Sequence, residues 1–103
     1  MILIEIQQRR VYVFGHAGYA PEGADIVCAG ITALTDTLWM SLETFTNDIE
    51  SVREDSGIMD IKLKSLSKAG ALLVDSFVIG VTAIAGEYPD NVQVRDDRPR
   101  REA

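Results

Sequence analysis

Apolar and polar residues alternate over residues 1–8, with isoleucine at Ile2, Ile4 and Ile6. A period of two is typical of a strand that buries one face. Residues 11–15 form a second apolar run, which we interpret as the hairpin partner of the first strand. No Asn-Gly or Asp-Gly pair lies between the two runs, so the pattern does not predict the turn type.

The apolar period changes to three and four residues over 25–47, which predicts a long amphipathic helix. Asp25 is placed to cap this helix, because its carboxylate can accept from the backbone N–H groups of the first turn. The preceding residues 15–24 include Gly18 and Gly23 and are predicted to form a loop. The buried stripe of the helix is expected to comprise Val27, Ile31, Leu34, Leu38, Leu42 and Phe45, continued by Ile49.

A further pair of strands and a second helix follow. Residues 48–54 and 58–66 are predicted to pair as a hairpin around the Asp-Ser-Gly turn that ends at Gly57, which can adopt positive φ. Ser67 can cap a helix that runs to about residue 87 and is stopped by Pro89.

A short strand at 92–95 completes the order β-β-α-β-β-α-β. We predict a single α+β domain over residues 1–95, with two helices packed on a mostly antiparallel sheet. Residues 96–103 are charged and are expected to form a disordered C-terminal tail. The second helix is apolar around most of its circumference, which predicts a subunit interface in addition to the core. The strand order does not follow from the pattern.

The composition indicates a soluble globular protein, with 47% hydrophobic and 25% charged residues among 103. The net charge of −6 argues against nonspecific nucleic-acid binding and favours basic partners. The apolar window 69–86 contains Asp75 and is flanked by Lys68 and Glu87, which favours a buried helix over a membrane span. We therefore expect no membrane segment, no signal peptide and a cytoplasmic location, where a lone cysteine stays reduced.

Cys28 and His16 are the only cysteine and the only histidine of the chain. Cys28 falls in the first turn of the predicted helix, where free backbone N–H groups and the helix dipole stabilise a thiolate. His16 follows the second strand, and the loop is long enough to bring it back to the cysteine. An imidazole there would stabilise the thiolate and later protonate a leaving amine. The pair predicts a thiol hydrolase.

Residues around this pair receive supporting roles. Thr32 lies four residues after Cys28 on the same helix face, so its hydroxyl can hold the thiolate or a substrate carbonyl, or bond back to the helix. Asp25 can orient His16 instead of capping the helix. Backbone N–H groups at Cys28 and its neighbours are candidates for an oxyanion hole. The glycines expected to let the loop open for substrate are Gly15, Gly18 and Gly23.

Two other interpretations of the cysteine remain open. It can be a packed side chain in a non-catalytic binding module, or belong to a redox sensor that forms an intermolecular disulfide. One histidine and one cysteine are too few for a structural zinc site, and the loop lacks the GxGxxG spacing and the lysine of a phosphate cradle. We predict no metal and no cofactor.

The block GHAGYAPEGADIVCAGITALT resembles the signature of the ribosomal-processing cysteine protease family, Prp. That family carries Gly-His-Ala, a flexible glycine-bearing loop, and Asp-x-x-Cys-Ala at the start of a helix. Residues 87–94, EYPDNVQV, also resemble its closing Tyr-Pro-x-x-Val segment. This sequence departs from the usual pattern in its short first hairpin, in Thr32 where serine is common, and in Gly30 where alanine is common.

The resemblance implies that Cys28 and His16 are the catalytic pair and that Asp25 occupies the family's acidic position. It also implies a homodimeric α+β endopeptidase from certain bacteria. With a packed cysteine, the alternative is a non-catalytic, ribosome-associated binding module. The endopeptidase would remove a short N-terminal extension from large-subunit ribosomal protein twenty-seven, cutting after a hydrophobic motif that contains aromatic residues. An acidic enzyme is electrostatically suited to a very basic ribosomal protein precursor.

Overall fold

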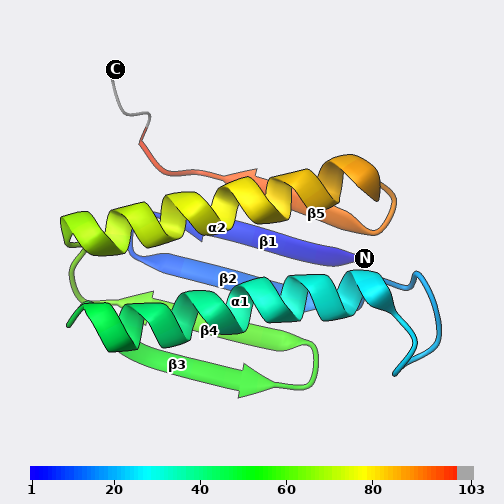
Figure 1. Ribbon diagram of the computed structural model, residues 1–103, viewed down its shortest axis with the longest axis horizontal. Helices are drawn as coiled ribbons and strands as arrows, with labels where there is room; N and C mark the ends of the chain where they lie inside the picture. Colours follow the sequence, from blue (N-terminus) through cyan, green and yellow to red (C-terminus); the bar gives the residue numbers. More distant parts are fainter. Residues whose placement is uncertain (100–103) are drawn as a thin grey trace.

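The computed structural model describes residues 1–99 and confirms the predicted order β-β-α-β-β-α-β (Figure 1). The elements are β1 (Ile2–Gln7), β2 (Arg10–Gly15), α1 (Ile26–Phe45), β3 (Ile49–Asp55), β4 (Ile58–Leu63), α2 (Lys68–Glu87) and β5 (Val92–Asp96). Asp25 and Ser67 are the N-caps of the two helices, as the sequence predicts.

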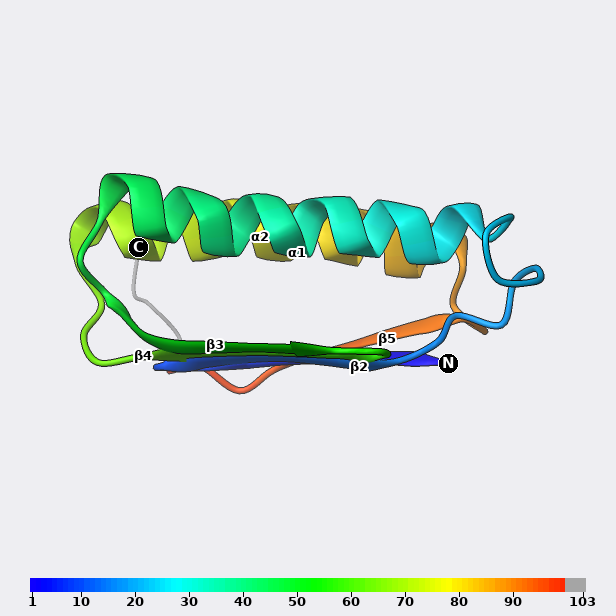
Figure 2. The same ribbon diagram turned by 90° about the horizontal axis from the view of Figure 1, so that it is seen from below.

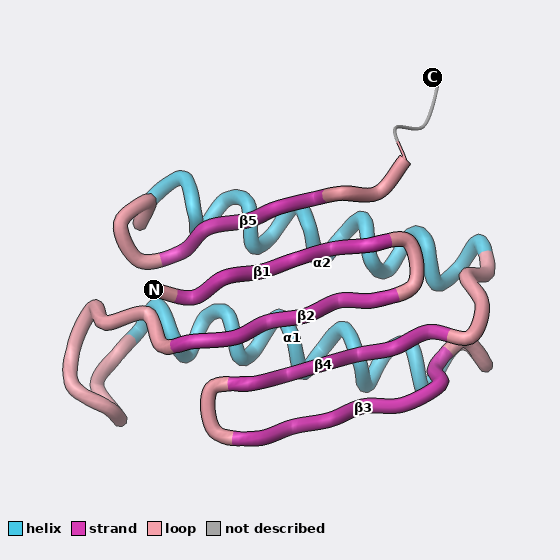
Figure 3. Tube along the Cα trace, turned by 180° about the vertical axis from the view of Figure 1, so that it is seen from behind, coloured by secondary structure: helices cyan, strands magenta, loops and turns pink. Residues whose placement is uncertain are grey.

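The strands form one mixed sheet in the order β3-β4-β2-β1-β5. Neighbouring strands are antiparallel except β1 and β5, which run parallel (Figure 3). Both helices lie on the same face of this sheet (Figure 2). The predicted α+β class, with two layers and a mostly antiparallel sheet, is therefore confirmed. The parallel pairing is possible because α2 carries the chain back along the sheet before β5 begins.

The core lies between the helices and the inner face of the sheet. Alternate residues of the strands point inward, and Ile4, Ile6 and Ile61 have no exposed surface. The helices contribute the buried apolar side chains Val27, Ile31, Leu38, Leu42, Val74, Phe77 and Val81.

The predicted stripe of α1 is wrong at its C-terminal end. Phe45 is 70% exposed, because the helix ends at this residue and no further turn packs beside its ring. Leu34 is only partly buried and packs against the edge of the core, whereas the neighbouring Thr35 is buried. Thr35 satisfies its hydroxyl by donating to the Ile31 carbonyl at 2.7 Å.

Glycines let α1 and α2 approach closely. A Cβ atom placed on Gly80 of α2 would lie 3.0 Å from Leu34 Cδ1, and one placed on Gly30 of α1 would lie 3.3 Å from Ile84 Cδ1. Each helix thus accepts a branched side chain of the other where it has no side chain of its own. These contacts hold the N-terminal half of α1, which carries Cys28, against α2.

Large apolar side chains are exposed on the outer face of the helix layer. Leu72 and Ile79 of α2 are 68% and 73% exposed, and Met40 of α1 is 51% exposed. Within residues 1–99, α2 is the one helix with the length and apolar composition of a membrane span, a test that core helices of soluble proteins also pass. Its inner face packs in the core through Val74, Phe77 and Val81.

Some predicted boundaries shift. The first helix ends two residues before the predicted position 47, because Thr46 is its C-cap and donates its N–H to the Leu42 carbonyl. β4 ends at Leu63 rather than at residue 66. These shifts are confined to element ends, where capping bonds decide the last residue.

The C-terminal segment is ordered further than the sequence predicts. β5 includes Asp96, which the sequence assigns to the tail, and the Arg98 guanidinium binds the carboxylates of Asp96 and Asp75 at 2.8 and 2.7 Å. The segment is thereby attached to α2, which carries Asp75. Residues 100–103 of the predicted disordered tail lie outside the described residues.

Asp48 joins the end of α1 to the start of α2. Its carboxylate is 3% exposed and accepts from the Ser67 N–H at 2.9 Å, the Ser67 hydroxyl at 2.8 Å and the Ser65 hydroxyl at 3.3 Å. Burial alone would raise the pKa of Asp48, but the hydrogen bonds from Ser67 and Ser65 outweigh it and hold that pKa below its ordinary value. The carboxylate therefore stabilises the fold in its charged form.

We expect Asp48→Ala to lower the free energy of unfolding by about 1–3 kcal/mol near neutral pH, because charge-assisted hydrogen bonds are lost. The folded pKa of Asp48 is depressed, so its contribution is complete above the unfolded value of about 4 and is lost as the pH falls through the folded value. Urea denaturation should therefore give a smaller difference between variant and wild type at about pH 3 than near neutral pH. Glu50→Ala, which removes an exposed carboxylate of β3, is the matched control. An equal difference at both pH values would contradict this role.

Candidate active site

The end of β2 fixes the position of His16. Gly15 has a φ of 97°, and a Cβ atom there would collide with the Met1 carbonyl oxygen. The Gly15 N–H donates to the Gly57 carbonyl at 2.8 Å, which joins the end of β2 to the β3–β4 turn. The chain therefore leaves β2 beside this turn, and only glycine fits the position.

The β3–β4 turn forms the floor under the imidazole. A Cβ atom on Gly57 would lie 2.9 Å from His16 Nε2 and 3.3 Å from Cε1. Gly57 has a φ of 72°, as predicted for a turn glycine, and its missing side chain leaves the space that the ring occupies.

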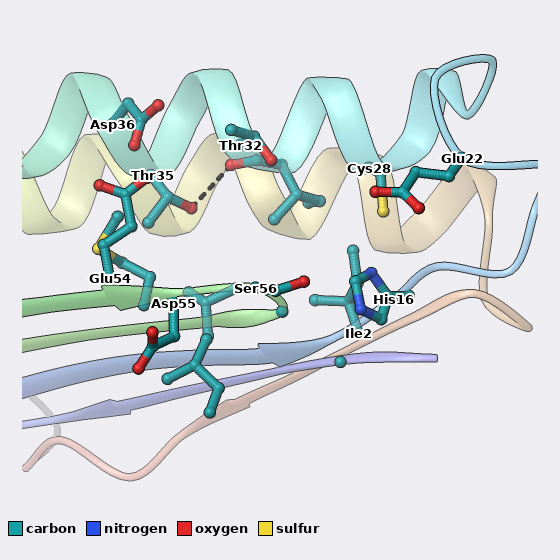
Figure 4. A pocket seen from close by; sticks show the side chains of 16 residues that line it. Ile2, His16, Glu22, Cys28, Thr32, Thr35, Asp36, Glu54, Asp55 and Ser56 are labelled. Atoms are coloured by element: carbon teal, nitrogen blue, oxygen red, sulfur yellow. Dashed lines mark hydrogen bonds between the residues drawn. The ribbon is translucent and has the colours of Figure 1, made fainter.

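Cys28 lies in the first turn of α1 and is half-buried. Its Sγ atom accepts a hydrogen bond from the Ala17 N–H at 3.4 Å. Figure 4 shows the sulfur pointing from the helix toward the imidazole of His16, which lies on the sheet side. The structure thus brings together the two residues that the sequence singles out, and they line one groove of about 300 Å³.

Asp25 uses both carboxylate oxygens on backbone N–H groups. Oδ1 accepts from Val27 and Cys28, each at 3.0 Å, and Oδ2 accepts from Tyr19 at 3.0 Å and Ala20 at 3.3 Å. The bond from the Cys28 N–H, aided by those from Ala20, Tyr19 and Val27, holds the pKa of Asp25 below its ordinary value against the opposing effect of burial. Of the two roles the sequence leaves open, the structure places Asp25 in the capping role.

The backbone N–H groups that were expected to form an oxyanion hole already have hydrogen-bond partners. The Cys28 N–H donates to Asp25 Oδ1, and the Ala29 N–H donates to the Asp25 carbonyl at 3.1 Å. Neither group is free to bind a developing oxyanion in this conformation. The Ala17 N–H, which the sequence analysis did not consider, is the backbone donor that points at the sulfur.

Thr32 faces the groove one helical turn after Cys28. Thr35, Thr37 and Thr44 of α1 donate to the carbonyl four residues before them, whereas within residues 1–99 the Thr32 hydroxyl makes no such bond. Its hydroxyl is therefore available to a ligand of the groove.

The loop between β2 and α1 borders a second hollow. This hollow, of about 600 Å³, adjoins the groove, with which it shares His16, Cys28 and Thr32, and lies between the loop and the exposed face of α1. Gly18 and Gly23 line it and have φ values of 69° and 87°, so the loop depends on glycine where it bends. Cys28 thus lines both hollows, an arrangement suited to an extended ligand that passes over the sulfur.

Sequence reasoning missed the carboxylates that line the groove. Four carboxylates line it, and their elements are far apart in the sequence: Glu22, Asp36, Glu54 and Asp55. The β3–β4 turn was identified only as a turn, because the pairing of β4 with β2 cannot be derived from the pattern. Within residues 1–99 no group of three or more histidine, cysteine, aspartate or glutamate side chains is arranged to hold a metal ion.

Comparison with known proteins shows which family the chain belongs to. Residues 1–93 match the family described as cysteine protease Prp. The chain belongs to the Prp family. The Prp match covers both hollows and every residue of the groove.

Similar Prp proteins cover nearly the whole chain. The ribosomal processing cysteine protease Prp of Mycoplasma genitalium is 31% identical over 94% of this chain and 97% of its own length. The Bacillus subtilis protein of the same name is 28% identical over 78% of each chain. The S. aureus Prp structure with a covalently linked product peptide has a TM-score of 0.87 at 23% identity, covering 94% of this chain and 100% of its own. This Prp chain is accordingly a cysteine protease, with the fold of those structures.

We expect Asp25→Ala to loosen the loop as well as the start of α1, because one carboxylate holds the N–H groups of both. Limited proteolysis with a nonspecific protease should cut the variant between residues 19 and 23 several-fold faster than the wild type. Asp36→Ala, a carboxylate on the same helix that makes no cap, is the control. Cutting at the wild-type rate in Asp25→Ala would contradict the tethering role.

Proposed function

We propose that this Prp-family protease cleaves peptides with Cys28 as nucleophile and His16 as general base and acid. The observation that carries the proposal is the Cys28 sulfur at the start of α1, pointing at the His16 imidazole inside one groove. The alternative of a packed, unreactive cysteine is less well supported, because Cys28 is half-buried and borders both hollows.

The chemistry follows from this geometry. Cys28 loses its proton to His16, and the thiolate attacks the scissile carbonyl carbon to form a tetrahedral intermediate. His16 then protonates the leaving amine, which departs and leaves an acyl-thioester on Cys28. The neutral imidazole next takes a proton from water, and the resulting attack releases the acid product and restores the thiol. In each half of the cycle His16 takes up one proton and gives it up again: first from Cys28 to the leaving amine, then from water to the Cys28 sulfur.

Two features of the fold direct positive dipoles at the sulfur. The first turn of α1 places the positive end of the helix dipole at Cys28, and the Ala17 N–H donates to its Sγ. The charge of Asp25 opposes this effect, and its two oxygens accept from four backbone N–H groups. The free hydroxyl of Thr32 is suited to hold a substrate carbonyl one turn along the groove.

We infer that the substrate is a basic ribosomal protein precursor. The relatives are named ribosomal processing proteases, and one S. aureus Prp structure contains a substrate peptide. The net charge of −6 and the groove carboxylates of Glu22, Asp36, Glu54 and Asp55 suit a cationic chain. The family resemblance names the N-terminal extension of large-subunit ribosomal protein twenty-seven, cleaved in the cytoplasm after a hydrophobic motif. This activity needs neither a nucleic acid nor a membrane.

Incubation of the precursor with the enzyme, followed by mass spectrometry of the new N-terminus, tests this function. We expect Cys28→Ala and Cys28→Ser to lower the cleavage rate by about 1,000-fold or more, and His16→Ala to have a similar effect at every pH. None of these changes leaves a large cavity, so the thermal midpoint should stay close to that of the wild type. Thr37→Ala, an exposed hydroxyl on the outer side of α1, is the matched control. Full cleavage by Cys28→Ala would refute the nucleophile.

We infer in addition that the enzyme is a homodimer that buries the outer face of its helix layer. The exposed side chains of Leu72, Ile79 and Met40 form an apolar surface in a chain that is otherwise rich in charge. A second copy of the same face would cover it with an equally apolar surface around a twofold axis.

A charge placed in the middle of this face tests the homodimer. Ile79→Glu should give a monomer in size-exclusion chromatography with light scattering, because the interface would bury two unpaired carboxylates. Gln93→Glu adds the same charge at an exposed position of β5, at the edge of the sheet, and should leave the dimer intact. The inference fails if wild type and Ile79→Glu have the same mass.

A further inference from the structure

A side chain from the far end of the sequence reaches the loop that carries His16. Asn91 lies in the turn between α2 and β5, and its Nδ2 donates to the Ala17 carbonyl at 2.9 Å. Ala17 is 2% exposed, and its own N–H donates to Cys28 Sγ at 3.4 Å. Two hydrogen bonds therefore connect the Asn91 amide to the sulfur through a single residue.

Ala17 needs such a tie because of its neighbours. It follows Gly15 and His16 and precedes Gly18, and both glycines adopt positive φ, at 97° and 69°. Glycine has the largest conformational freedom of any residue, so the short segment between them has little local preference for one orientation. The Ala17 carbonyl bound by Asn91 belongs to the peptide unit after Ala17, and the Ala17 N–H belongs to the unit before it. A contact from outside the segment that fixes one of these units restricts the other through the φ and ψ angles of Ala17.

Asn91 is itself rigidly held. Its N–H donates to the Tyr88 carbonyl at 3.0 Å, at the end of α2, and its carbonyl accepts from the Ile2 N–H at 2.9 Å, at the start of β1. The ring of Tyr88 also contacts that of Tyr19 edge to face, with centroids 5.2 Å apart. The turn that carries Asn91 is thus anchored to the helix, the sheet and the active-site loop.

We propose that Asn91 is a positioning residue of the protease, which holds Ala17 so that its N–H donates to the Cys28 sulfur and His16 stays opposite that sulfur. This inference rests on the proposed role of Cys28 as nucleophile. An N–H donor stabilises a thiolate more than a thiol, and a fixed imidazole needs no reorientation before proton transfer. Asn91 touches neither the sulfur nor the imidazole, and it acts through Ala17.

The arrangement also separates this role from general support of the fold. Asn91 is half-buried, so water can replace its amide at the Ala17 carbonyl when the side chain is removed. The backbone bonds of the turn to Tyr88 and Ile2 do not involve the side chain. Removing the amide should therefore disturb the orientation of the groups at the sulfur much more than it lowers the stability of the fold.

Kinetics of Asn91→Ala and Asn91→Asp on the precursor test this role, with Asp90→Ala as control, since Asp90 is an exposed residue of the same turn. Asn91→Asp keeps the size of the side chain but replaces the donor with an acceptor. For both Asn91 variants we expect kcat to fall by about 10- to 100-fold with KM within about twofold of the wild type, because positioning is lost and substrate contacts are kept. The thermal midpoint should stay close to that of the wild type in all three variants.

Alkylation of the folded protein by iodoacetamide across pH gives a second readout. In Asn91→Ala the midpoint of Cys28 labelling should move to higher pH, since the thiolate loses an aligned donor. This variant and the wild type have the same titratable groups around the sulfur and its groove, so these groups do not cause the shift. They are His16, Glu22, Asp25, Asp36, Glu54 and Asp55.

The outcomes divide clearly. Wild-type kcat and a wild-type labelling profile in both Asn91 variants would overturn the inference, and so would a fall in kcat matched by a large fall in thermal midpoint with unchanged labelling. Cleavage by the Cys28→Ala protein would instead defeat the proposed function, because that variant retains Asn91. A fall in kcat with a shifted labelling profile and an unchanged midpoint would establish the positioning role.

Discussion

The site depends above all on the four hydrogen bonds that the Asp25 carboxylate accepts. One oxygen defines where α1 begins, and the other holds the returning loop at Tyr19 and Ala20. Without the first, the chain has no fixed helix end at which to place Cys28. The second oxygen adds to the contacts that hold residues 16–24 over that end, since the loop bends at glycines that tolerate many conformations.

This solution has an electrostatic cost. A carboxylate three residues before a sulfur disfavours the charged form of that sulfur, whereas the helix dipole and the Ala17 N–H favour it. Four backbone N–H groups donate to the Asp25 carboxylate and surround its charge. The same bonds hold the pKa of Asp25 below its ordinary value, so the cap stays charged at any pH where a thiol protease would work.

Much of this site could be predicted from the sequence because its chemistry is local. His16, Asp25 and Cys28 lie within a single loop and helix start, and capping preference together with helix dipole physics places them without knowledge of the sheet. The order of the elements and both N-caps follow from periodicity and capping in the same way. The burial of Phe45 was predicted wrongly, because hydrophobic periodicity does not indicate where other elements cease to cover a helix.

The remaining parts of the site are contributed by contacts distant in sequence. Gly57 reaches His16 only because β4 pairs with β2, and Asn91 reaches Ala17 only because β5 pairs with β1. A hydrophobic pattern fixes which face of a strand is buried but not which strand is its neighbour. The sequence therefore did not distinguish the carboxylates that line the groove from ordinary solvent-exposed ones.

The parallel pairing of β5 with β1 has a consequence for the timing of activity. β1, at the start of the chain, pairs with β5, near its end. The turn that precedes β5 carries Asn91, whose amide is bonded to Ala17. During synthesis, Cys28 and His16 emerge long before Asn91 and β5. On the roles proposed above for these residues, a growing polypeptide would carry the reactive groups before the segment that aligns them.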